Sequence, residues 1–120
     1  MSYKILVVDD CKDIRELMTL ALQPEGYEVA VAKNGRQALQ KLNTEILPDL
    51  IFVDHEMDEL DGPGFLRELE QLHPEILATV PIIMFTGTQS HLVSKNCATE
   101  IVEKPLGVNP LRMLVKRYLH

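Results

Sequence analysis

Apolar residues along the chain form short continuous runs that alternate with segments of helical spacing. Runs without polar alternation are typical of strands buried on both faces, as in parallel sheets. Three of these apolar runs are four residues long, and two others are shorter. The predicted strands are 5–8, 29–31, 50–53, 82–85 and 101–102.

Between these strands, apolar side chains recur every three or four residues, which predicts helices packed on a sheet. Pro74 is expected to end the third helix. The segment 87–99 is polar and weakly periodic, so it predicts a short or loose fourth helix. Asn109 is predicted to cap the last helix, with Pro110 at its first position.

The alternation of strand and helix repeats five times, which favours a parallel sheet covered by helices on both faces. The predicted architecture is therefore an α/β fold, a three-layer α/β/α sandwich. A length of 120 residues fits one domain, 1–120. In such sheets ligands bind beyond the carboxyl ends of the strands.

The charge balance excludes several classes of function. The chain has 12 basic and 18 acidic residues and a net charge of −6, which argues against direct binding to nucleic acid or anionic membranes. The apolar runs are too short for membrane insertion. Two cysteines fit a reducing, cytoplasmic compartment better than a disulfide scaffold.

Polar residues follow four of the five predicted strands: Asp9 and Asp10, then Asp54, Thr86 and Lys104. If the first and third strands are neighbours, three carboxylates meet. Two unit charges ~4 Å apart repel by about 4 kcal/mol at an effective dielectric of 20. Such a site needs a proton, a cation or Lys104 to offset that repulsion. Each residue alone could be a helix cap or a solvated charge, but together they predict Mg²⁺ bound with a phosphoryl group.

The ordered motifs resemble the receiver domain of two-component response regulators over essentially the whole chain. They are Asp9-Asp10, Asp54 with Met57 three residues later, Asp61-Gly62, Thr86, and Lys104-Pro105. The resemblance implies a five-stranded sheet of flavodoxin-like order 2-1-3-4-5. It also implies a phosphoacceptor signalling domain rather than an enzyme, although such domains assist their own phosphorylation and dephosphorylation.

The resemblance further implies a role for each site residue. Asp54 would be the phosphoacceptor, and Thr86 and Lys104 would contact the phosphoryl group. The Mg²⁺ ligands would be Asp9, Asp10, Asp54 and the backbone carbonyl of Glu56. The bond between Lys104 and Pro105 would be cis.

The same resemblance names the partners. The phosphodonor would be a phosphohistidine on a sensor histidine kinase or on a histidine phosphotransfer domain. A downstream protein target would bind the surface that phosphorylation switches.

Some positions depart from the family pattern. Ile101 lies where the family often has an aromatic residue that reports phosphorylation. The segment between Thr86 and Lys104 is shorter than usual by roughly one helical turn of ~3.6 residues, which would shorten the fourth helix. His55, next to Asp54, is expected to be an exposed loop residue.

Two alternatives stay open. A phosphatase similar to the haloacid dehalogenases also uses an aspartate nucleophile, but it requires Asp-x-Asp where this chain has Asp9-Asp10-Cys11. A receiver fold could also serve as an interaction scaffold without phosphotransfer. Ile101 and the shortened fourth helix keep that second alternative open.

Overall fold

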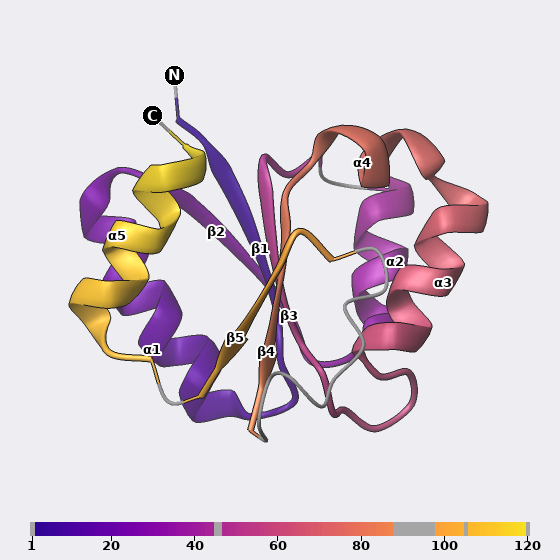
Figure 1. Cartoon of the computed structure of the whole chain (residues 1–120), viewed down its shortest axis with the longest axis horizontal. Helices are drawn as coiled ribbons and strands as arrows, with labels where there is room; N and C mark the ends of the chain where they lie inside the picture. Colours follow the sequence, from indigo (N-terminus) through magenta and orange to yellow (C-terminus); the bar gives the residue numbers. More distant parts are fainter. Residues whose placement is uncertain (1, 45–46, 88–97, 105, 120) are drawn as a thin grey trace.

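A single parallel sheet forms the centre of the molecule (Figure 1). The computed structural model describes residues 2–44, 47–87, 98–104 and 106–119. The five strands lie in the order β2-β1-β3-β4-β5, which confirms the predicted order. Their bounds are β1 Lys4–Val8, β2 Glu28–Ala32, β3 Leu50–Asp54, β4 Ile82–Thr86 and β5 Glu100–Glu103.

Helices cover both faces of this sheet, as a three-layer sandwich requires (Figure 1). Helices α1 and α5 lie on one face, and α2, α3 and α4 lie on the other. A short 3-10 turn, Gln23–Glu25, follows α1. The helix bounds are α1 Lys12–Leu22, α2 Gly35–Thr44, α3 Gly62–Leu72, α4 Pro74–Thr79 and α5 Val108–Tyr118.

The core consists of two apolar clusters, one on each face of the sheet. All residues of β3 and β4 are buried, which explains why these strands read as continuous apolar runs. Phe52 and Phe85 stack on the α1 and α5 side, with ring centroids 5.2 Å apart. The central strands are therefore held rigidly, and so are the residues at their carboxyl ends.

One expectation about helix boundaries is confirmed and one is wrong. The third helix ends before Pro74 as predicted, since α3 stops at Leu72. Pro74 then begins a further helix, α4, because proline is tolerated in the first turn, where its missing N–H has no intrahelical partner. Asn109 does not cap the last helix. Gly107 holds the cap position in an extended conformation, so α5 starts at Val108 and Pro110 lies within its first turn.

Two further expectations fall on residues outside the described ranges. Most of the segment predicted to form a shortened fourth helix, 88–97, is not described. The helix labelled α4 is a different one, and it precedes β4. Pro105, and with it the expected cis bond, also lies outside the described residues. Within the described part of the chain, no helix combines the length and apolar character needed to cross a membrane.

Candidate functional site

Three carboxylates meet at the carboxyl edge of the sheet. Asp9 directly follows β1 and Asp54 ends β3, and these neighbouring strands pair Val8 with Val53. One carboxylate oxygen from each of Asp9, Asp10 and Asp54 lies within 4.8 Å of the others. The predicted meeting of the three acids is thus confirmed.

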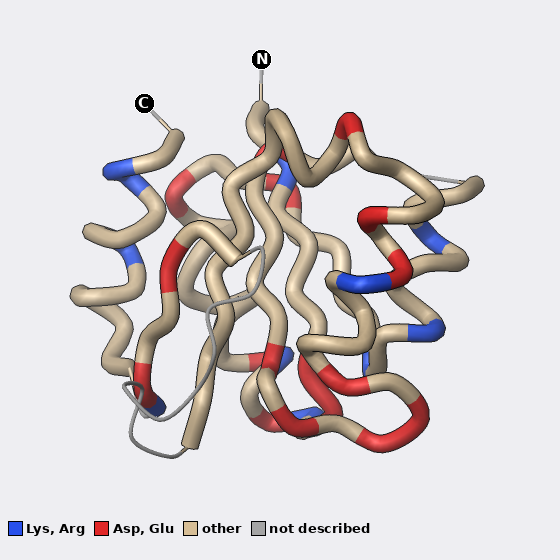
Figure 2. The backbone as a smooth tube through the Cα atoms, turned by 45° about the vertical axis from the view of Figure 1, so that its right-hand side comes forward, with Lys and Arg blue, Asp and Glu red and all other residues tan. Residues whose placement is uncertain are grey.

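Burial distinguishes the three acids. Asp9 and Asp54 are only 2% and 7% exposed, whereas Asp10 is exposed to solvent. Figure 2 shows further acidic segments gathered along this lower rim of the molecule. They include the exposed residues Glu56, Asp58, Glu59 and Asp61 of the loop between β3 and α3. The site is strongly anionic.

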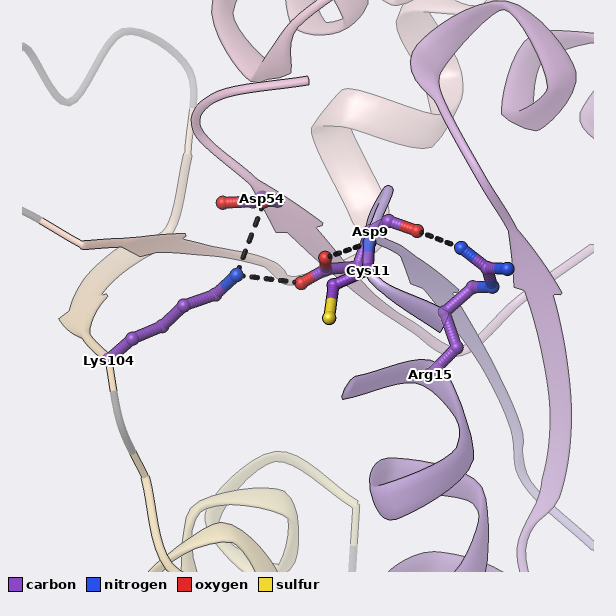
Figure 3. A network of polar contacts seen from close by, with 5 residues as sticks. All are labelled: Asp9, Cys11, Arg15, Asp54 and Lys104. Carbon is purple, nitrogen blue, oxygen red and sulfur yellow. Dashed lines mark hydrogen bonds and ion pairs between the residues drawn. The ribbon is translucent and has the colours of Figure 1, made fainter. Parts of the chain in front are cut away.

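Lys104 supplies the positive charge within this group (Figure 3). Its Nζ atom lies 2.8 Å from Oδ2 of Asp9 and 3.2 Å from Oδ2 of Asp54. The end of β5 positions this lysine, because its backbone N–H donates to the carbonyl of Thr86 at 2.7 Å. Lys104 therefore spans two carboxylates that lie on neighbouring strands.

The protonation equilibria of Asp54 and Lys104 respond to this environment. Burial raises the pKa of Asp54, and the nearby charge of Asp9 raises it further, while Lys104 only partly offsets both effects. Burial alone would lower the pKa of Lys104, but its hydrogen bond and charge interaction with Asp9, together with Asp54, outweigh burial and raise that pKa. The site therefore favours a charged lysine beside an acid that resists ionisation.

The start of α1 fixes the orientation of Asp9 (Figure 3). The Asp9 carboxylate accepts a hydrogen bond from the backbone N–H of Cys11 at 2.9 Å. Arg15 donates from Nη1 to the backbone carbonyl of Asp9 at 2.7 Å. Arg15 could not be predicted as a site residue, since nothing in its local sequence pattern distinguishes it from other polar residues on an amphipathic helix.

The other two predicted residues belong to the segments next to Asp54. Thr86 ends β4, the strand next to β3, and is fully buried there. Glu56 lies in the loop two residues after Asp54, and its backbone N–H donates to the Asp54 carboxylate. The structure thus brings all the predicted site residues to one edge of the sheet.

His55 differs from expectation. The residue is half-buried rather than exposed, because its backbone is held on both sides: its N–H donates to Phe85 and its carbonyl accepts from Gly62. Its Nδ1 atom is buried, and no residue in the described ranges forms a hydrogen bond with it. The side chain packs into the protein beside Asp54.

The donor set suits a hard divalent cation. Carboxylate oxygens are among the ligands that Mg²⁺ binds in proteins, and the close approach of three carboxylates leaves net negative charge even beside Lys104. The residues at this edge therefore fit the predicted Mg²⁺. Its presence here stays a prediction.

Comparison with known proteins gives one consistent family. The family model of the response regulator receiver domain matches residues 5–116. The regulatory protein AtoC of Escherichia coli is 33% identical over 120 residues, which cover 97% of this chain and 25% of AtoC. The chain thus spans about a quarter of the length of the curated relatives it matches.

Solved structures show the same similarity over whole chains. The chemotaxis response regulator CheY4 of Vibrio cholerae is 30% identical with a TM-score of 0.89, covering 99% of this chain and 100% of CheY4. The response regulator TrrA of Thermotoga maritima, in complex with Mg(2+)-BeF, is 36% identical with a TM-score of 0.81. That match covers 98% of this chain and 99% of TrrA.

Proposed function

We propose a function from the family to which this chain belongs, the response regulator receiver domains. The chain accepts a phosphoryl group on Asp54 in a two-component phosphorelay. The observation that carries this proposal is the position of Asp54, which is buried beside Asp9 and Lys104 at the carboxyl edge of the sheet. The receiver domain would span residues 1–120, and the family match covers 5–116 of them.

In the proposed reaction, a carboxylate oxygen of Asp54 attacks the phosphorus atom of a phosphohistidine. The bond between phosphorus and the histidine nitrogen breaks, and an acyl phosphate forms on Asp54. Lys104 would then pair with one phosphoryl oxygen, and the hydroxyl of Thr86 would donate to another. Little covalent chemistry is required of the protein, so its contribution is positioning and stabilisation of charge.

Asp9, Asp10, Asp54 and the backbone carbonyl of Glu56 would hold Mg²⁺. A bound Mg²⁺ would offset negative charge on the attacking carboxylate and on the transferred group. The close approach of the three carboxylates supports this assignment. So does the Mg(2+)-BeF complex of TrrA, which has the same fold.

The proposed phosphodonor is a sensor histidine kinase or a histidine phosphotransfer domain, and the proposed location is the cytoplasm, where such donors act. Phosphorylation adds nearly two negative charges beside Lys104 and Thr86. Movement of Lys104 and Thr86 toward the phosphoryl group would change a surface that a downstream protein recognises. Ile101 packs against the core and is aliphatic, so the signal would not use an aromatic switch at that position.

Intact-mass measurement with a small phosphodonor and Mg²⁺ tests the proposal. The unchanged protein should gain one phosphoryl group, and Asp54→Asn should gain none. Asp58→Asn is the matched control, since Asp58 is exposed in the same loop and should leave phosphorylation intact.

Two other results would point to the alternatives. Failure of the unchanged protein to form an adduct, even with chelators absent, would support the scaffold without phosphotransfer. Sustained turnover of a general phosphatase substrate would support the phosphatase similar to haloacid dehalogenases.

A further inference from the structure

The loop between β3 and α3 has an unusual backbone. Glu59 and Leu60 are consecutive non-glycine residues with positive φ, at 63° and 156°. Residues other than glycine rarely adopt such backbone conformations, which persist only where the surrounding structure holds them. This loop starts at the proposed phosphoacceptor and carries Glu56, whose carbonyl is a proposed Mg²⁺ ligand. Specific contacts hold this loop in place.

Leu60 is held between two glycines at the starts of two helices. A Cβ atom on Gly35, at the start of α2, would lie 2.7 Å from the Leu60 carbonyl oxygen and 3.1 Å from its Cδ2. A Cβ atom on Gly64, in the first turn of α3, would lie 2.8 Å from Leu60 Cδ1. The N–H of Gly35 also donates to the Leu60 carbonyl at 3.1 Å. A side chain at Gly35 would therefore collide with the backbone of Leu60, whereas one at Gly64 would collide only with the end of the Leu60 side chain.

The start of α2 is itself firmly held. Asn34 is only 7% exposed, and its Oδ1 accepts from the backbone N–H of Gln37 at 2.8 Å. The Gln37 side chain in turn accepts from the backbone N–H of Lys33 at 2.8 Å. The Asn34 amide also reaches Oε2 of Glu59 at 3.5 Å. The side chains of Asn34 and Gln37 thus cap the start of α2 and hold the backbone that contacts Leu60.

The far end of the loop is closed in a similar way. A Cβ atom on Gly62 would lie 2.7 Å from the carbonyl oxygen of Asp54, and the Gly62 N–H donates to the His55 carbonyl. The backbone around Asp54 and Glu56 thus has one fixed end at Gly62 and one held point at Leu60. Since Glu56 and Leu60 lie in the same loop, whose ends are joined by the bond from Gly62 to His55, we expect a displaced Leu60 to shift the Glu56 carbonyl.

We propose that Leu60, held between Gly35 and Gly64, is a positioning residue for the metal and phosphoryl site. This inference rests on the proposed function, and it adds the start of α2 to the parts of the fold that set metal affinity. That start lies on the opposite face of the sheet from α1 and α5 (Figure 1). Because coupling between two sites is reciprocal, Mg²⁺ binding should also protect the start of α2.

Substitution of Gly35 tests the inference in the full chain. Gly35→Ala should weaken Mg²⁺ binding about tenfold, the size of loss typical when an outer-shell support of a metal site is removed. The measurement is calorimetric titration with Mg²⁺ alone, without phosphodonor. In the unchanged protein, hydrogen exchange of the Gly35 amide should slow on addition of Mg²⁺.

Two controls separate positioning from simple loss of stability. Leu42→Ala removes a buried side chain elsewhere on α2 and should lower the melting temperature without changing Mg²⁺ affinity. Gly107→Ala makes the same change at the N-cap of α5, where the nearest atom to a Cβ is 3.5 Å away, so it should leave Mg²⁺ affinity unchanged whatever it does to the melting temperature. Leu60→Met should retain most of the affinity that Leu60→Ala loses, and this pair decides the matter if Gly35→Ala does not fold.

The inference would be overturned if Gly35→Ala and Leu60→Ala both lowered the melting temperature but left Mg²⁺ affinity unchanged. Leu60 would then be a purely structural residue. The unchanged protein distinguishes this from failure of the proposed function. Absence of Mg²⁺ binding there, or binding unaffected by Asp54→Asn, would overturn the proposed function and this inference with it.

Discussion

The Nζ atom of Lys104 lies closer to Asp9, at 2.8 Å, than to Asp54, at 3.2 Å. The lysine donates a hydrogen bond to the carboxylate of Asp9, which belongs to the proposed metal ligands. The proposed phosphoacceptor therefore has incomplete charge compensation, in agreement with its raised pKa. Without metal, the site holds two buried carboxylates and one cation, and this imbalance determines how it should respond to substitution.

Asp54→Asn should stabilise the metal-free protein at neutral pH. The pKa of Asp54 is raised above its ordinary value of 3.8, so its ionisation costs stability in the folded state. Asparagine removes that cost while Lys104 keeps Asp9 as a partner. We expect the free energy of unfolding to rise on the order of 1 kcal/mol, which raises the melting temperature by ~4 °C in a domain of this size.

The pH dependence of this effect has a definite sign. A raised pKa means that the folded state holds the proton more tightly, so the stability that Asp54 contributes is lost as the pH rises from 3.8 through its folded pKa. The advantage of Asp54→Asn should therefore grow over that range and then become constant. Melting curves from acid to neutral pH measure it, and an advantage that shrank with rising pH would contradict the assignment.

Lys104→Met should have the opposite effect on stability. It leaves Asp9 and Asp54 without their cation, and removal of one partner from a largely buried pair costs several kcal/mol when burial is complete. Lys104 is partly exposed, so we expect a smaller loss, about 1–3 kcal/mol, in the metal-free protein. Mg²⁺ should bind more tightly, because the competing cation is gone.

Chemical denaturation and Mg²⁺ titration together check this prediction. Lys12→Met is the matched control, since Lys12 is highly exposed and forms only a surface ion pair with Glu16 at 3.8 Å. The contribution of Lys104 should persist through neutral pH and be lost as the pH rises from 10.5 through its raised folded-state pKa. Weaker Mg²⁺ binding in Lys104→Met would show that the lysine supports the metal rather than competing with it.

The features that follow from sequence are those that depend on local pattern. The apolar runs ending at Val8 and Val53 identified buried strands, and parallel strands of one sheet bring their carboxyl ends to a common edge. The meeting of Asp9 with Asp54 could therefore be predicted. The roles of these residues came from the family resemblance, because spacing alone cannot separate a nucleophile from a metal ligand.

The features that could not be predicted depend on contacts between distant segments. Asn34-Gly35 resembles a turn in sequence, but the structure uses Asn34 as a helix cap and Gly35 as the space for Leu60. The burial of His55 also results from packing that no periodicity reveals. The end of α3 before Pro74 was predicted correctly, but the helix α4 that begins at Pro74 was not, because proline both ends helices and begins them.

Thr86 should affect phosphorylation without affecting metal binding. It is buried at the end of β4 and is not among the proposed Mg²⁺ ligands. Thr86→Val keeps the shape but removes the hydroxyl, so phosphorylation should slow by about tenfold, the equivalent of ~1.4 kcal/mol of transition-state stabilisation. Thr86→Ser should retain most of the rate, which a purely steric role would not predict. Rates from intact-mass time courses and Mg²⁺ titrations provide the comparison.

Mg²⁺ should stabilise the folded protein through the three carboxylates. A ligand that binds only the folded state adds about 2.7 kcal/mol of stability at a concentration one hundred times its dissociation constant. Asp9→Asn should abolish most of that gain, because it removes a buried member of the carboxylate group. Asp58→Asn should retain the gain, since Asp58 is exposed in the loop between β3 and α3 and is not part of that group. Melting temperatures measured across a Mg²⁺ series distinguish the two variants, and equal losses would mean that Mg²⁺ responds to the general negative charge of the rim rather than to a defined site.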